Sequence, residues 1–236
     1  MIWPDLFVST SVTPVSSTPP RLGISFVQAS ASEASIPISR ASTHCGDDDG
    51  VATAMTIHQN LSEYGIAGVV WNCARALIFF LHGQPQLLAK KRVLELGAGT
   101  GAVGLAIALH QDTRGDDDED GCIEALILTD LASVVPFTTQ NVLSVALDHA
   151  NIHAMLNRNA LSAQAYCWGD ALSESLRAYA ADVVLCSDCL YETTQYAKLL
   201  TSLLALTDTS QKENAAEGDS ATNTIVLIAY KQRIPG

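Results

Sequence analysis

The sequence has no uncharged apolar run of about 18 residues, the length that a helix needs to cross a membrane. The nearest candidate, residues 66–81, contains Asn72 and Arg75. The first residues also lack the basic start and apolar centre of a secretory signal peptide. These absences predict a protein without a membrane segment. We expect it in the cytoplasm, with the nucleus as a second compartment.

Basic residues are scarce as well. The chain has 13 Lys and Arg against 25 Asp and Glu, a formal net charge of −12. Part of this excess lies in two acidic runs, at 47–49 and 116–120, so the remainder is only mildly acidic. No basic stripe is present, which argues against a nucleic-acid partner, because phosphate backbones are bound mainly by Lys and Arg. A mildly acidic surface suits a protein substrate that presents a lysine.

A second pair of metal ligands at the spacing of a zinc site is missing from the sequence. Cys186 and Cys189 form one C-x-x-C, but a zinc site would need a second pair of ligands at suitable spacing. The six cysteines fall in or beside segments predicted to form the core, which is typical of reduced thiols in an intracellular protein. We therefore predict no metal site and interpret this pair as buried side chains.

The 236 residues are enough for one α/β domain with a sizeable core. Residues 1–50 are rich in Ser, Thr and Pro, and we expect them to be mostly disordered, with one short strand at 23–27. Residues 51–236 form the predicted domain. Its expected strands are 92–96, 125–129, 163–167, 182–186 and 224–230, and its expected helices are 69–81, 102–109, 133–149, 171–179 and 193–206. This alternation predicts a doubly wound, Rossmann-like parallel sheet that binds ligands at the carboxyl ends of its strands.

The most informative segment is 93–104, which reads V-L-E-L-G-A-G-T-G-A-V-G. An apolar strand carrying Glu95 passes into a turn with Gly97, Gly99 and Gly101, and an apolar helix follows. Glycine lets the backbone turn sharply and a ligand approach it closely, and the first amides of the helix point at that ligand. The pattern predicts a site for a mononucleotide-like cofactor.

The same glycines leave a second cofactor open. Residues 99–104 match the dinucleotide fingerprint G-x-G-x-x-G, which expects an acidic residue about 20 positions later. That window holds only the run at 116–120, which we expect to be a loop. The next strand ends in Asp130, whose carboxylate suits a ribose diol in either cofactor. A nicotinamide-dependent oxidoreductase is therefore the alternative.

Other polar and aromatic residues follow the predicted strands. Asp130 would bind a ribose or cap the next helix, and Trp168 would border an adenine or fill the core. Asp188 would orient an incoming amine, and Tyr191 would face an ammonium or sulfonium with its ring; the alternative is a helix cap and a rim tyrosine. Trp71 precedes the first strand, where it would line the pocket or pack in the core.

These motifs, in this order over residues 60–233, resemble the lysine methyltransferase family 16. They are most similar to its methyltransferase-21 subgroup, which includes the valosin-containing-protein lysine methyltransferase. The resemblance implies a seven-strand enzyme that uses S-adenosylmethionine (SAM) to methylate lysine side chains of specific proteins, often chaperones or ATPases. We expect such a protein partner and a monomer. The cofactor residues that the resemblance implies are Trp71, Gly97, Gly99, Asp130, Trp168 and Ser187.

The D-x-x-Y element of that family matches Asp188 and Tyr191, which implies a substrate-side role for both. The chain departs from the family at Asn72, where Asp is usual, and in longer loops at 115–121 and before the last strand. It ends at residue 236, where the family continues with a helix and a two-strand hairpin, so we expect a sheet without that hairpin and with an open edge.

Two further functions stay open. Amino methyltransferases that act on bases or glutamine carry Asn/Asp-Pro-Pro-Tyr/Phe after the fourth strand, whereas residues 187–191 read Ser-Asp-Cys-Leu-Tyr, which favours a lysine acceptor. A non-catalytic, SAM-binding scaffold protein is the alternative from a different class.

Overall fold

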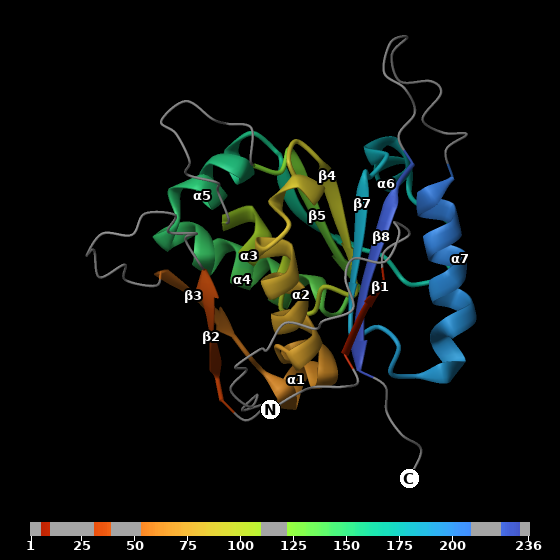
Figure 1. Cartoon of the computed structure of the whole chain (residues 1–236). Helices are drawn as coiled ribbons and strands as arrows, with labels where there is room; N and C mark the ends of the chain where they lie inside the picture. Colours follow the sequence, from red (N-terminus) through yellow and green to blue (C-terminus); the bar gives the residue numbers. More distant parts are fainter. Residues whose placement is uncertain (1–5, 10–30, 39–52, 110–121, 209–222, 232–236) are drawn as a thin grey trace.

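The computed structural model describes residues 6–9, 31–38, 53–109, 122–208 and 223–231 (Figure 1). The strands are β1 (Leu6–Ser9), β2 (Glu33–Ile38), β3 (Thr53–His58), β4 (Arg92–Leu96), β5 (Ala125–Asp130), β6 (Leu161–Ala165), β7 (Val183–Ser187) and β8 (Ile225–Lys231). The helices are α1 (Leu61–Tyr64), α2 (Asn72–His82), α3 (Ala102–Leu109), α4 (Val135–Asp148), α5 (Ala150–Asn157), α6 (Glu174–Tyr179) and α7 (Tyr196–Thr207). Three 3-10 turns are η1 (Gly65–Gly68), η2 (Pro85–Leu87) and η4 (Thr193–Gln195).

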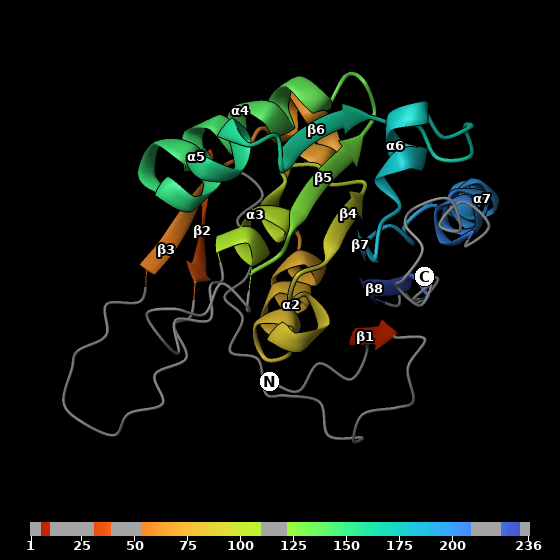
Figure 2. The same cartoon turned by 90° about the horizontal axis from the view of Figure 1, so that it is seen from above.

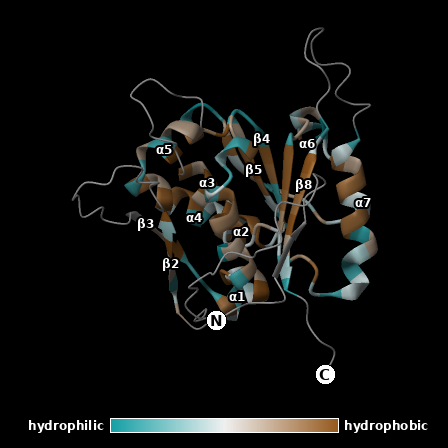
Figure 3. Ribbon diagram, viewed as in Figure 1, coloured by the Kyte–Doolittle hydropathy of each residue, from teal (hydrophilic) through white to brown (hydrophobic). Residues whose placement is uncertain are grey.

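The main sheet confirms the predicted Rossmann-like α/β fold. Its strand order is β1-β8-β7-β4-β5-β6, in which the last five are mutually parallel. Helices α2 to α5 cover one face and α6 and α7 lie on the other (Figure 2). The central strands are apolar runs, as expected of a sheet buried on both faces (Figure 3).

The strand order indicates which edge of the sheet would bind a ligand. Strand β4 has β5 on one side and β7 on the other, so the chain reverses its direction of progress across the sheet at β4. Ligands of such sheets bind in the crevice at the carboxyl ends of the strands beside this reversal. The segments that follow β4, β5, β6 and β7 therefore meet there.

A second, two-stranded ribbon corrects the prediction for residues 1–50. Strands β2 and β3 pair antiparallel, and β2 alternates exposed with buried residues. Its buried residues Ala34, Ile36 and Ile38 join the core beside Met55 and Ile57 of β3. The expected disorder is therefore wrong for residues 33–38, where the period-2 alternation was the available signal. The strand expected at 23–27 lies outside the described residues.

The edge of the main sheet differs from the prediction. Strand β1 pairs antiparallel with β8, Leu6 opposite Lys231 and Ser9 opposite Ile228. The open edge expected beside β8 is therefore wrong for residues 228–231, because β1 pairs with them. The segment 6–9 is also a second part of residues 1–50 that is not disordered.

Most remaining boundaries agree with the sequence. The bounds of β4 and α3 are as expected, while the expected helix at 133–149 ends at Asp148 and is followed by α5, which was not predicted. His149 separates the two with extended backbone angles. Strand β6 begins two residues before its predicted start at 163.

Candidate active site

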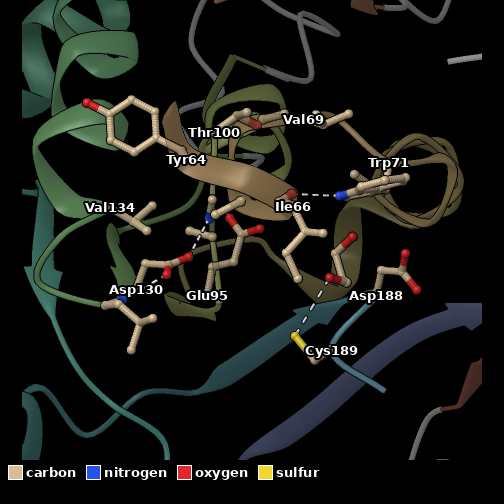
Figure 4. A pocket seen from close by; sticks show the side chains of 18 of the residues that line it. Tyr64, Ile66, Val69, Trp71, Glu95, Thr100, Asp130, Val134, Asp188 and Cys189 are labelled. Atoms are coloured by element: carbon tan, nitrogen blue, oxygen red, sulfur yellow. Dashed lines mark hydrogen bonds between the residues drawn. The ribbon is translucent and has the colours of Figure 1, made fainter. Parts of the chain in front are cut away.

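A cavity of about 790 Å³ opens at the carboxyl ends of β4, β5, β6 and β7 (Figure 4). Its volume falls in the usual range for sites that hold a small ligand or cofactor. The structure brings together nine of the ten predicted site residues along this cavity: Trp71, Glu95, Gly97, Gly99, Asp130, Trp168, Ser187, Asp188 and Tyr191. Gly101 does not line it and instead carries a turn of the loop with φ +77°.

The glycine turn is shaped by close backbone contacts. Gly97 and Gly99 have φ of +66° and +53°, which side chains rarely adopt. A Cβ atom on Gly99 would lie 2.7 Å from the carbonyl oxygen of Ala67, and one on Gly97 would lie 3.0 Å from Cζ2 of Trp168. The turn therefore depends on glycine both for its backbone angles and for the space that the neighbouring walls occupy.

Asp130 braces this turn from the end of β5. Its Oδ2 accepts a hydrogen bond from the Gly99 N–H at 2.7 Å, and its Oδ1 accepts one from the Leu131 N–H at 2.7 Å. The alternative of a cap for α4 is wrong, since the cap residue there is Val134. Each carboxylate oxygen can accept a further bond, so Asp130 fits the predicted contact with ribose hydroxyls.

Glu95 lies beneath the turn and is almost completely buried. Its Oε2 accepts a hydrogen bond of 2.9 Å from the N–H of Gly104, which lies in the first turn of α3. Burial raises the pKa of this carboxyl to about 8, and the neighbouring charge of Asp130 acts in the same direction. The free protein therefore holds Glu95 largely protonated at neutral pH.

Replacing Glu95 by glutamine should stabilise the free protein in a pH-dependent way. The folded pKa of about 8 lies above the unfolded value of 4.5, so the free energy of unfolding of the natural protein falls as pH rises through this window. Glutamine keeps the acceptor for Gly104 and does not titrate. We expect urea unfolding to show no gain at pH 4.5 and a gain of about 2 kcal/mol or more at pH 8. A pH-independent difference would contradict this.

Both predicted tryptophans lie at the cavity with their rings partly exposed, rather than fully inside the core. The indole Nε1–H of Trp71 donates to the Ile66 carbonyl at 2.8 Å, which fixes this ring to the preceding turn (Figure 4). The Trp168 segment is tied to α7, because the Gly169 N–H donates to Ser202 Oγ at 2.9 Å. Their contacts with a cofactor remain predictions.

The D-x-x-Y element follows β7. Asp188 has φ +55°, an unusual value for a residue other than glycine, and its N–H donates to the Ala229 carbonyl at 2.7 Å. It does not cap η4, because Glu192 does so by accepting from the Thr194 N–H. Tyr191 is 41% exposed at the cavity, and burial raises the pKa of its hydroxyl. The left-handed backbone turns this segment sharply at the cavity.

The charge of the cavity has one sign. Among its lining residues, all within the described part of the chain, there is no Lys, Arg or His. The ionisable carboxyls are Glu63, Glu95, Asp130, Asp188 and Glu192. A cation is therefore the favoured occupant, and it would offset the desolvation of Glu95 and Asp130.

The residues that sequence reasoning missed form the opposite wall. Tyr64, Ile66 and Ala67 come from α1 and η1, and Tyr64 stacks on Phe137 of α4 with ring centroids 4.5 Å apart. The exposed apolar Ile66 just before Trp71 was the available signal. This wall comes close enough to the glycine turn to touch Gly99.

Cys186 and Cys189 are buried and unpaired, and Cys189 also lines the cavity floor. In the described residues, no group of three or more His, Cys, Asp and Glu could hold a metal ion.

No single described helix is long and apolar enough to span a membrane. The pair Leu61–Gly68 and Asn72–His82, bent by 48°, meets the criteria of length and composition only together.

The sheet order, the glycine turn and the cavity at the reversal of strand order define a Rossmann-like domain that binds a nucleotide-like cofactor. A model of the lysine methyltransferase family matches residues 51–234. The chain belongs to this family, which confirms the resemblance inferred from its motifs.

Three similar proteins are named as protein-lysine methyltransferases. The chain is 26% identical over 218 residues to the protein-lysine N-methyltransferase EFM6 of Saccharomyces cerevisiae, covering 83% of this chain and 78% of the relative. It is 30% identical to the protein N-lysine methyltransferase METTL21A of Danio rerio (75% and 66% covered). It is 31% identical to the protein-lysine N-methyltransferase EEF2KMT of Homo sapiens (73% and 48% covered). The chain thus spans less than two thirds of the latter two relatives.

Proposed function

We propose that this protein transfers a methyl group from SAM to a lysine side chain of a protein substrate. The observation that carries the proposal is one cavity that joins the glycine turn and Asp130 to the D-x-x-Y element and is lined by carboxyls without a basic residue. This combination fits a cationic cofactor at one end and a cationic acceptor at the other.

The residues present fit SAM. Asp130 offers carboxylate oxygens to ribose hydroxyls, and the glycine turn leaves room for a ligand against its backbone. Trp71 and Trp168 supply ring surface, and Ser187 lies where β7 meets the cavity. When bound, SAM supplies a methyl group that is already activated by its positive sulfonium.

The same charges disfavour the dinucleotide alternative. A nicotinamide dinucleotide carries a pyrophosphate, which helix amides and basic side chains usually bind. Here the Gly99 amide already donates to the carboxylate of Asp130, and no basic residue lines the cavity. A pyrophosphate at this turn would therefore meet negative charge.

The acceptor side needs only to bind and orient an amine that has given up its proton to water. The carboxylate of Asp188 would hold the lysine nitrogen, and the ring of Tyr191 would bound its path. A lysine must lose its proton before it can attack, and its ordinary pKa of about 10.4 falls when it is desolvated beside a cation. Alignment then supplies most of the rate, since no covalent intermediate on the protein is required.

Titration calorimetry with S-adenosylhomocysteine, with NAD as the control ligand, tests the cofactor. We expect micromolar binding of the first compound only. Tritiated SAM added with a cell lysate should then label protein, and mass spectrometry of the labelled band should find methyl-lysine. Binding of NAD alone would overturn the proposal in favour of an oxidoreductase.

The substrate, assembly state and compartment are finer parts of the proposal. We propose that a monomer in the cytoplasm, and also in the nucleus, modifies a chaperone or an ATPase, as the resemblance implies. The alternative from a different class remains a non-catalytic, SAM-binding scaffold. Tight S-adenosylhomocysteine binding without methylation of any lysate protein would support the scaffold.

A further inference from the structure

We propose that Thr138 and Asn141 of α4 are positioning residues that aim the backbone N–H of Thr100 into the cavity, where it binds the carboxylate of the cofactor. Thr138 Oγ1 donates to the Gly99 carbonyl at 2.6 Å, and Asn141 Nδ2 donates to the Thr100 carbonyl at 3.0 Å. The inference rests on the proposed use of SAM.

The geometry of the peptide unit links the Thr138 bond to the Thr100 amide, while the Asn141 bond holds the following peptide unit, between Thr100 and Gly101. In a trans peptide the carbonyl of one residue and the N–H of the next point in opposite directions, and no described peptide bond is cis. The Gly99 carbonyl points at α4, so the Thr100 N–H points away from α4. Thr100 lines the cavity, and within the described residues its N–H has no protein acceptor.

Three neighbouring backbone N–H groups already donate hydrogen bonds within the protein. The Ala98 N–H donates to Thr129, the Gly99 N–H to Asp130 and the Gly101 N–H to Ala98. Among the described residues, the Thr100 N–H has no protein acceptor, and neither have those of Ala102 and Val103 at the start of α3. The Thr100 N–H is the one whose peptide unit is held by a side chain of α4, and it lies directly before the first turn of α3, where the helix dipole favours negative charge. The only anionic group of SAM is its carboxylate, which assigns this group to the Thr100 amide.

The two positioning residues are otherwise unexpected where they are. Thr138 and Asn141 are 1% and 0% exposed, on the inner face of a helix, where Thr and Asn are poor helix formers. A buried polar side chain is stable in such a place only when it forms hydrogen bonds, as both of these do. Thr129 acts in the same way from β5, where its Oγ1 donates to the Glu95 carbonyl at 2.7 Å.

Asn141 also connects the turn to the β2–β3 ribbon. Its Oδ1 accepts from the His58 N–H at 3.0 Å, and its Nδ2 donates to the His58 carbonyl at 3.1 Å. One side chain thus pairs with the end of β3 as a neighbouring strand would, while also holding Thr100. The ribbon therefore supports the cofactor turn.

The test compares two ligands that differ at the amino-acid end. S-adenosylhomocysteine carries the carboxylate, whereas methylthioadenosine has the same nucleoside and sulfur without it. We expect Thr138→Val to weaken S-adenosylhomocysteine binding about tenfold or more, and methylthioadenosine binding less than about threefold. Thr138→Ser keeps the hydroxyl and should restore the natural ratio of the two affinities.

Thr139→Val is the matched control. Thr139 is the next residue of α4, and its Oγ1 donates to the Val135 carbonyl within the helix, so its loss should leave both affinities unchanged. Asn141→Asp is the second variant. It keeps the acceptor for the His58 N–H but loses the donor to the Thr100 and His58 carbonyls, and it should shift the affinity ratio in the same direction as Thr138→Val.

The outcomes separate the two proposals. Equal losses for both ligands in Thr138→Val and Asn141→Asp, or no loss, would overturn the positioning role while the proposed cofactor stands. If the natural protein binds neither ligand, the proposed function fails first, and the positioning role fails with it.

Discussion

Replacing Asp188 by asparagine is expected to lower methyl transfer by about 100-fold while S-adenosylhomocysteine affinity changes by less than about threefold. Loss of a positioned charge that holds the reacting group costs roughly 2–4 kcal/mol of transition-state stabilisation. Asparagine adopts the left-handed backbone of φ +55° as readily as aspartate and keeps the N–H bond to the Ala229 carbonyl. The variant therefore removes the negative charge and leaves the turn in place.

The measurement is incorporation of tritiated methyl groups into lysate protein, with calorimetry on the same preparations. Glu192→Gln is the control, because Glu192 also lines the cavity while its Oε1 caps η4. We expect it to lower transfer by less than about fivefold. Equal losses in the two variants would show that the cavity needs negative charge in general, and the role of Asp188 as an orienting group would be abandoned.

Much of this site could be predicted from sequence because its determinants are local. Strand β4 and helix α3 are bounded by the glycine turn itself, where three glycines interrupt two apolar runs. The other site residues follow strands, and parallel strands end at one edge of the sheet. The order of segments therefore brought Asp130, Trp168 and Asp188 to one cavity, although their roles toward a cofactor or a lysine remain predictions.

What the sequence did not indicate depends on contacts between distant segments. The β2–β3 ribbon pairs residues on either side of positions 39–52, and its link to the cofactor turn is one buried side chain, Asn141. Strand β1 pairs with β8, although more than two hundred residues of sequence separate them. Helix α5 was missed for another reason: His149 alone separates it from α4, without a proline or glycine to mark the break.

Replacing Gly99 by alanine is expected to cost stability and cofactor affinity together. A Cβ atom at φ +53° is strained, and it would lie 2.7 Å from the Ala67 carbonyl oxygen, which is backbone and cannot rotate away. Relief requires the η1 wall or the glycine turn to move, and the turn carries the Gly99 N–H bond to Asp130. We expect urea unfolding to show a loss of about 3 kcal/mol. We also expect S-adenosylhomocysteine affinity to fall by about 100-fold or more, as site geometry is lost.

The variant Gly65→Ala separates backbone strain from the collision with the Ala67 carbonyl. Gly65 has nearly the same φ, +55°, but a Cβ atom there would meet nothing within 4 Å. Because ψ of −136° places Gly65 outside the left-handed helical region, this variant carries conformational strain of about 1–3 kcal/mol without a collision, and it should bind S-adenosylhomocysteine normally. The difference between the two alanine variants measures how closely η1 packs on the cofactor turn. Equal costs would mean that the wall yields freely, and the cavity would then be shaped by the turn alone.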